Sequence, residues 1–300
     1  MIMRLHKSLL WFIVLSMFVV LASCSTAKKV TRIVMRDTEP KKKVALMGIA
    51  NRTEFAMDEY AQALEQILLT TLEKEKSLLV VTPADIKAAG FNPVMSRDLR
   101  ELERFIPYAK QMGLNAIITG DISELEIVHN LYGIYGLRKE KPTLQMILRM
   151  KLVDVETRTV LFEGYRRAKM KLDLPASADT QMYLKQNKIL PASFMDDIVE
   201  DMGEDIESAM ADQPWKSYIA AIDGNTVQFP AGQDVGLKDG NNLVVLSEGK
   251  QLVNYAGQKF RLPGSQIGSV RCAKVEQSTT IAEIVEGDGF KVGDVLTVPD

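Results

Sequence analysis

The residue with the clearest chemistry is Cys24, a thiol that stands directly after an apolar segment near the amino terminus. Arg4 and Lys7 give the start of the chain a positive charge, and residues 8–21 form an apolar run that is too short and wrongly flanked for a mature membrane span. This pattern predicts an export signal. An ordinary secretory signal, which is the alternative, needs only small residues at the cleavage site and no cysteine.

The residues Leu21-Ala22-Ser23-Cys24 resemble the bacterial lipobox. The resemblance implies cleavage after residue 23 and a covalent diacylglycerol and N-acyl lipid on Cys24, with no other cofactor. Several acyl chains, at about 0.8 kcal/mol per buried CH₂, hold a protein on a bilayer far better than one chain does. Ser25 stands where aspartate is the usual signal for inner-membrane retention. The resemblance therefore also implies a lipid-anchored location at the periplasmic face of the outer membrane.

Charge and composition narrow the classes of function. Removal of residues 1–23 takes away two basic residues and no carboxylate, which lowers the formal net charge from −2 to −4. Nothing in this charge balance indicates a nucleic-acid partner. The hydrophobic fraction of 46% is ordinary for globular proteins, and the mature chain is long enough for two modest domains.

The mature chain has few side chains of the types that catalyse reactions. After cleavage it would keep one histidine, His129, and one cysteine without lipid, Cys272. One imidazole and one thiol cannot assemble an ordinary zinc site, and neither a G-x-S-x-G elbow nor a phosphate-binding glycine loop is present. We expect His129 in a loop at a strand end and Cys272 as a buried thiol, a reactive or intermolecular cysteine being the alternative. Asp196 and Glu200 lie one helical turn apart, as a glycosidase could use, but solvation of an outer helix face explains them equally well. We therefore expect no enzyme and no metal site.

The pattern of the chain divides it into four segments. Residues 1–23 are the signal peptide, residues 24–42 a basic flexible tether, residues 43–213 an α/β domain and residues 214–300 a small all-β domain. The last boundary lies where Pro214 ends a helix and short strands separated by glycine turns begin, which favours a small antiparallel β-barrel.

Apolar periodicity predicts the elements of the α/β domain. Continuous apolar runs indicate strands at 43–49, 78–81 and 115–128, and alternation about a polar turn indicates a long hairpin of residues 143–155 and 159–170. Apolar stripes spaced by three and four residues predict helices over 57–76, 84–88, 96–113 and 194–211. Pro107 should kink or split the third of these helices.

Residues 43–211 are similar to two related groups of proteins. The similarity lies in Val44-Ala45-Leu46-Met47-Gly48-Ile49, in residues 114–120 (LNAIITG) and in the hairpin of residues 152–161. These segments resemble the curli-secretion lipoprotein family and the amino-terminal domain of the Tol-Pal translocation protein B. The resemblance implies an α/β (α+β) Tol-like domain with a mixed sheet. It transfers no binding residue, because the matching positions are apolar patterns.

Residues 234–240, 268–270 and 292–296 resemble the final domain of flagellar assembly protein T, which a Tol-like domain also precedes. That resemblance implies a ring-forming or stabilising accessory of an envelope-spanning machine, although the flagellar protein is not typically lipidated. We therefore expect a non-enzymatic outer-membrane lipoprotein that serves an envelope machine, most plausibly the flagellum. The expected partners are the membrane, through the lipid anchor, and other envelope proteins.

Two further functions remain open, namely a subunit of an oligomeric curli-type secretion channel and an activator of cell-wall synthases. The channel requires homo-oligomers and long alternating hairpins, whereas residues 126–141 break the alternation. Within that segment four apolar side chains are candidates for an exposed partner contact, the alternative being that they fold back onto the core: Tyr132, Ile134, Tyr135 and Leu137.

Overall fold

The structure is a computed structural model that describes residues 39–55, 58–92, 102–135, 137–175, 182–183 and 192–299. The chain divides into two units, Met1–Glu39 and Pro40–Asp300, and the described helices and strands belong to the second unit. The predicted signal peptide, most of the predicted tether with Cys24 and Ser25, and the predicted helix start at residue 96 lie outside the described residues.

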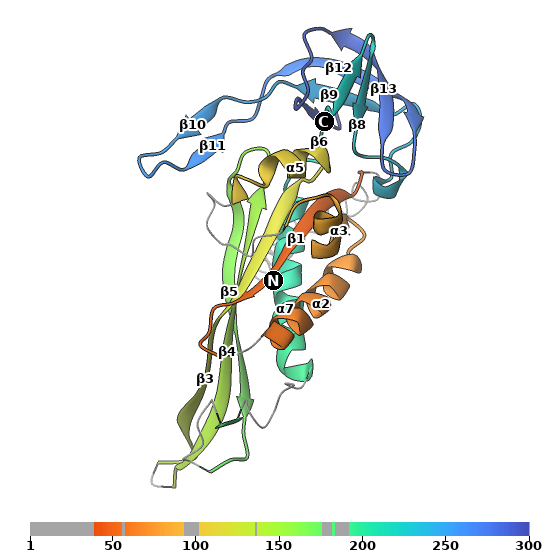
Figure 1. The fold of residues 1–300 in the computed structure, drawn as a ribbon. Coiled ribbons are helices and arrows are strands. Elements are labelled where there is room, and N and C mark those ends of the chain that lie inside the picture. Colours follow the sequence, from red (N-terminus) through yellow and green to blue (C-terminus); the bar gives the residue numbers. More distant parts are fainter. Residues whose placement is uncertain are drawn as a thin grey trace, which may run out of the picture. The chain divides into compact units, whose positions relative to one another are not determined.

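A five-stranded mixed sheet forms the α/β part, with strand order β2-β1-β3-β4-β5 (Figure 1). The first strand is buried along nearly its whole length, as expected for a continuous apolar run, and it pairs in parallel with β2 and β3. The remaining pairs are antiparallel. The strand bounds are β1 Lys42–Asn51, β2 Leu78–Val81, β3 Ala116–Tyr132, β4 Lys139–Asp154 and β5 Val160–Lys171.

Helices cover both faces of this sheet. One face carries α2 (Asp58–Glu73) and α7 (Ala192–Ala211), whose apolar stripes belong to one buried cluster with the inward side chains of the strands. The stripe predicted for the last helix is buried from Phe194 to Met210, because the helix period of 3.6 residues brings every third or fourth side chain onto the sheet. The other face packs against α3 (Pro83–Ala88) and α5 (Ile106–Gln111).

Proline and a capping box set the bounds of the two short helices. Pro107 lies in the first turn of α5, where its missing N–H costs nothing, and turn residues separate α5 from Leu102, so the predicted helix is split as expected. Thr82 caps α3 by accepting a hydrogen bond from the Asp85 N–H at 3.2 Å, and the Asp85 carboxylate accepts one from the Thr82 N–H at 2.9 Å.

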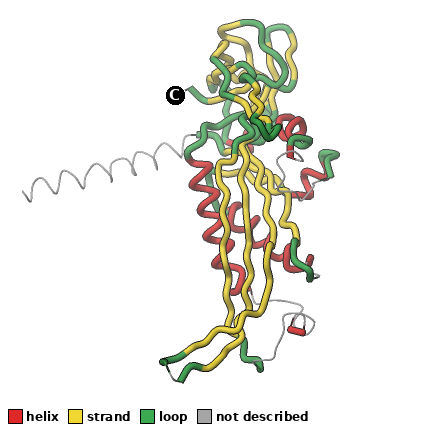
Figure 2. The backbone as a smooth tube through the Cα atoms, turned by 90° about the vertical axis from the view of Figure 1, so that its left-hand side faces the viewer, coloured by secondary structure: helices red, strands yellow, loops and turns green. Residues whose placement is uncertain are grey.

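The hairpin of β3 and β4 is longer than predicted. Pairing continues from Val128 with Thr143 to Tyr132 with Lys139, so His129 lies inside a strand and the prediction of a loop histidine was wrong. The strand pairing continues past the helices, where no described helix packs on either face of the ribbon (Figures 1 and 2). Alternation fails there because no core selects for it.

The β part is a curled, seven-stranded antiparallel sheet with order β6-β14-β9-β12-β13-β8-β7. The expected barrel is not closed, because the two edge strands, β6 and β7, pair with β14 and β8 and not with each other. A separate two-stranded hairpin of β10 and β11 and a 3-10 turn complete it. The bounds are β6 Ser217–Tyr218, β7 Ala221–Asp223, β8 Thr226–Phe229, η1 Gln233–Val235, β9 Asn242–Leu246, β10 Gln251–Val253, β11 Lys259–Arg261, β12 Gln266–Val275, β13 Thr280–Gly287 and β14 Val295–Thr297.

Candidate functional site

The turn that joins β3 to β4 exposes a group of large apolar side chains, here called the β3–β4 tip. It consists of Leu131, Ile134, Tyr135 and Leu137, which are 64%, 80%, 90% and 79% exposed. Three of these belong to the predicted partner contact, and they do not fold back onto the core. The fourth predicted residue, Tyr132, is half-buried and lies on the face of the ribbon, with its hydroxyl 3.2 Å from the Thr143 hydroxyl.

Basic side chains surround the β3–β4 tip. The Lys171 ammonium lies 4.6 Å from the centre of the Tyr132 ring, and the Arg138 guanidinium lies 5.9 Å from the centre of the Tyr135 ring. Both distances are within the range of cation–π attraction. Lys169 is also exposed, on the same side of β5 as Lys171.

A second exposed apolar group lies on the β10–β11 hairpin, where Tyr255 is 105% exposed and Val253 and Leu262 are also largely exposed. Ion pairs fix the base of this hairpin: the Arg261 guanidinium lies 2.7 Å from the Glu248 carboxylate. The sequence analysis missed this group. Its only signal was the turn around Gly257, which predicts a hairpin but not the exposure of its side chains.

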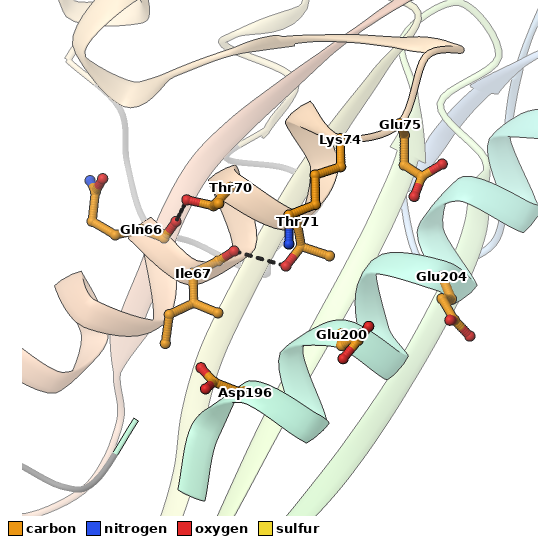
Figure 3. Close-up of a pocket in the computed structure, with 9 residues that line it drawn as sticks. All are labelled: Gln66, Ile67, Thr70, Thr71, Lys74, Glu75, Asp196, Glu200 and Glu204. Atoms are coloured by element: carbon orange, nitrogen blue, oxygen red, sulfur yellow. Dashed lines mark hydrogen bonds between the residues drawn. The ribbon is translucent and has the colours of Figure 1, made fainter. Parts of the chain in front are cut away.

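A groove of about 520 Å³ lies between α2 and α7 (Figure 3). The hydroxyls of Thr70 and Thr71 point back to their own helix and donate to the carbonyls of Gln66 and Ile67, each at 2.9 Å. The groove therefore combines four carboxylate side chains with apolar surface. Its lining residues are Gln66, Ile67, Thr70, Thr71, Lys74, Glu75, Asp196, Glu200 and Glu204.

A buried ion-pair cluster joins the β part to the α/β part. The Lys216 ammonium lies 2.8 Å from the Asp154 carboxylate and 3.3 Å from the Glu156 carboxylate, and all three side chains are almost fully buried. Burial and the nearby carboxylates of Asp154 and Glu156 raise the pKa of Tyr218 well above its usual value. The Asn115 amide completes the joint by donating to the Lys216 carbonyl at 2.7 Å. This geometry fixes two structural parts together.

Reactive groups outside this joint are few in the described part of the chain. Cys272 is buried in β12, and burial raises the pKa of its thiol to about 11, which keeps it protonated at neutral pH. No group of three His, Cys, Asp or Glu side chains that could hold a metal ion occurs among the described residues. Within the same ranges, no helix has the length and apolar character needed to cross a membrane.

Comparison with known proteins gives partial structural similarities. No protein-family model and no curated protein matches the chain. The lipoprotein GNA1162 from Neisseria meningitidis is 11% identical, covering 56% of this chain and 99% of its own, with a TM-score of 0.34. The PelC dodecamer from Paraburkholderia phytofirmans is 13% identical, covering 58% and 89%, with a TM-score of 0.31. The LpoB C-terminal domain from Salmonella enterica is 17% identical, covering 44% and 85%, with a TM-score of 0.29. Scores this low carry no conclusion about what this chain does.

Proposed function

We propose that this chain is a non-enzymatic outer-membrane lipoprotein that docks other envelope proteins as an accessory of an envelope-spanning machine. The observation that carries the proposal is the β10–β11 hairpin, which presents Val253, Tyr255 and Leu262 to solvent. Exposed apolar groups with a polar surround mark interaction sites, and tyrosine is prominent among the residues that dominate binding energy.

Contacts at the base of the β10–β11 hairpin support a docking role, because they attach the hairpin to the rest of the chain. The Lys259 ammonium lies 3.4 Å from the Glu103 carboxylate, and the Arg261 N–H donates to the Thr157 carbonyl at 2.8 Å. The hairpin is thereby tied to the turn between β4 and β5 as well as to its own sheet. A binding surface held in place in this way loses little conformational entropy when a partner docks.

The absence of enzyme activity and of a cofactor is part of the proposal. The buried carboxylates of Asp154 and Glu156 share one ammonium in a structural joint, which explains their presence without a substrate. Burial raises the pKa of the Cys272 thiol, so the thiol stays protonated and is a poor nucleophile. The only group that we propose to be attached is the lipid on Cys24.

A photo-cross-linking amino acid placed at Tyr255 in the native envelope tests the docking surface. We expect one discrete adduct with another envelope protein. The matched control is the same amino acid at Val292, which is exposed on the same β part and should give no discrete adduct. Equal labelling from both positions, or none from Tyr255, would contradict the proposal.

The lipid anchor has its own test. Radiolabelled palmitate should enter the wild-type chain and should not enter the Cys24→Ala variant, which should also leave the outer-membrane fraction. Uptake of label by the variant would exclude Cys24 as the attachment point.

Within this class we propose the flagellum as the machine served, on the strength of the resemblance of residues 234–240, 268–270 and 292–296. A deletion strain should then lose motility and show incomplete basal-body rings in electron cryotomography. An adduct of this chain with further copies of itself, in a heat-resistant multimer, would favour the curli-type channel instead. A penicillin-binding protein as the adduct would favour an activator of cell-wall synthases.

A further inference from the structure

The β3–β4 tip exposes apolar side chains that the core of this chain does not explain. Strand β5 ends at Lys171, which pairs with Thr143, and the Leu172 N–H still donates to the Pro142 carbonyl at 2.9 Å. Beyond that point β3 and β4 are the only described strands that remain paired here. Both views of the chain show this ribbon continuing beyond α2 and α7 (Figures 1 and 2). Leu131, Ile134 and Tyr135 are therefore largely exposed, and no described helix or further strand covers them.

Basic residues outnumber acidic ones on β5 and at the start of β4, next to this tip, whereas β3 exposes Glu124 and Glu126 farther from it. Residues 165–171 contain four basic residues and no acidic one, and residues 137–141 contain three basic residues and one acidic one. The side chains of Arg167, Lys169 and Lys171 are exposed on one face of β5, while the intervening Ala168 is buried and Met170 packs against the core. Arg166 is different, because it pairs with Asp201 and Asp205 of α7. We call Arg138, Lys141, Lys169 and Lys171 the basic collar of the tip, since Arg167 lies farther along β5, opposite Ile147.

We propose that the β3–β4 tip inserts into the surface of an anionic phospholipid bilayer. An apolar end binds the boundary between headgroups and acyl chains, and each Lys or Arg of the collar near an anionic surface contributes about 1 kcal/mol. Tyr135 is suited to this boundary because its ring has an apolar body and a polar hydroxyl. The turn itself stays at the boundary, since its backbone polar groups need water or headgroups as partners.

A second copy of the chain fits the tip less well. The acidic groove between α2 and α7 complements the charge of the collar, but its lining offers one apolar side chain, Ile67. Ile134, Tyr135 and Leu137 would meet few apolar side chains there, whereas a bilayer offers acyl chains to the apolar end and anionic headgroups to the basic collar. The inference does not depend on the proposed docking role of the β10–β11 hairpin or on the acylation of Cys24.

Tryptophan reporters in the full mature chain test the inference. Tyr135→Trp places the reporter in the tip, and Tyr255→Trp places a matched reporter on the other exposed hairpin. The mature chain has one native tryptophan, Trp215, which is 1% exposed and contributes equally to both variants. The chain is mixed with vesicles of phosphatidylglycerol or phosphatidylcholine whose acyl chains carry bromine, which quenches nearby tryptophan.

We expect the emission of Tyr135→Trp to shift to shorter wavelength and to be quenched in phosphatidylglycerol, and that of Tyr255→Trp to stay unchanged. Adding Lys169→Gln and Lys171→Gln should weaken the quenching at position 135 by about fivefold in apparent affinity for each charge removed. A chain without acyl groups should show the same response at higher vesicle concentration, so that failure of acylation and failure of tip insertion are distinguishable.

Two results would overturn the inference. One is equal quenching of both reporters, or of Tyr135→Trp in both lipids, since neither would reflect an anionic site at the tip. The other is shielding of Tyr135→Trp without vesicles that grows with protein concentration, which would assign the tip to a second copy of the chain.

Discussion

Cys272 links the pH of the solution to the stability of the β part. Burial raises the pKa of its thiol from an ordinary value of 9.0 to about 11, so the folded chain holds this proton more tightly than the unfolded chain does. The stabilisation is complete below pH 9.0 and is lost as the pH rises through about 11. At still higher pH we expect the loss to reach about 2 to 3 kcal/mol.

Urea unfolding of wild type and Cys272→Ala across this pH range measures that effect. The difference between the two free energies of unfolding should shrink as the pH rises, because only wild type contains the thiol. Lysine and tyrosine titration affects both proteins and cancels. If the difference in the free energy of unfolding did not change with pH, the raised pKa of the Cys272 thiol would be contradicted.

Lys216 is the residue whose loss should cost most, because it neutralises two buried carboxylates. Lys216→Met leaves Asp154 and Glu156 facing each other without an ammonium, and we expect a loss of about 3 to 5 kcal/mol in the free energy of unfolding. Chemical denaturation provides the measurement.

The control for this variant is Lys274→Met, which breaks an equally short ion pair with Glu276 at the surface. We expect its unfolding to stay close to that of wild type, because water solvates the carboxylate that is left. Similar losses in the two variants would show that burial of the Lys216 cluster is not what makes it important. Adding Glu156→Gln to Lys216→Met should restore part of the lost stability.

At the level of elements, Gly113 and Gly90 form a natural comparison, since each follows a six-residue helix with a positive φ, +71° and +88°. A Cβ at Gly90 would meet nothing within 4 Å, whereas a Cβ at Gly113 would lie 2.5 Å from the Pro230 carbonyl oxygen. Gly90→Ala should cost about 1 to 2 kcal/mol from the left-handed backbone alone. Gly113→Ala should cost about 1 to 3 kcal/mol more, because α5 must move away from the β part.

Thermal unfolding of both variants separates the cost of the left-handed backbone from the cost of the contact with Pro230. Equal losses of stability would show that α5 yields to the added methyl group without strain. A larger loss for Gly90→Ala would mean that the contact with Pro230 is absent in solution.

The elements that sequence predicts best are those that pack on a core. The stripe of α7 from Phe194 to Met210 is buried as predicted, because each inward position is fixed by contact with the sheet. The end of β3 was missed for the complementary reason, since Leu131 and Tyr132 lie where the ribbon leaves the core and alternation carries no information. Barrel closure was also beyond local patterns, because it depends on how the whole seven-stranded sheet curls and not on the residues of any one strand.

The residues of the candidate site were also hard to predict where they do not pack on a core. The sequence singled out Ile134, Tyr135 and Leu137 because apolar residues without period stand out, but their exposure required the position of the helices. Tyr255 lies in a short turn segment between Asn254 and Ala256, so no periodic pattern identified it. The Lys216 cluster joins residues about sixty positions apart, and no spacing rule relates them.

At the level of the whole molecule, the α/β part and the β part share a core. Phe105 and Ile106 belong to the same buried cluster as Tyr218 and Val295, and the Lys43 ammonium bonds the Pro230 carbonyl at 3.1 Å. Because each part buries side chains of the other, we expect both to unfold in one cooperative transition. Far-ultraviolet circular dichroism reports the helices of the α/β part, and alkylation of Cys272 reports the β part.

Thr280→Val tests this cooperativity from inside the β part. The Thr280 hydroxyl donates to the Ala231 carbonyl at 2.6 Å, so the variant leaves a buried acceptor without its donor and should cost about 1 to 3 kcal/mol. If the two parts unfold together, the urea midpoint of the helical signal falls by the same amount as the midpoint of thiol exposure. The exposed Thr70→Val in α2 should leave both midpoints nearly unchanged. A fall in the midpoint of thiol exposure with an unchanged helical midpoint would show that the two parts are stable independently of each other.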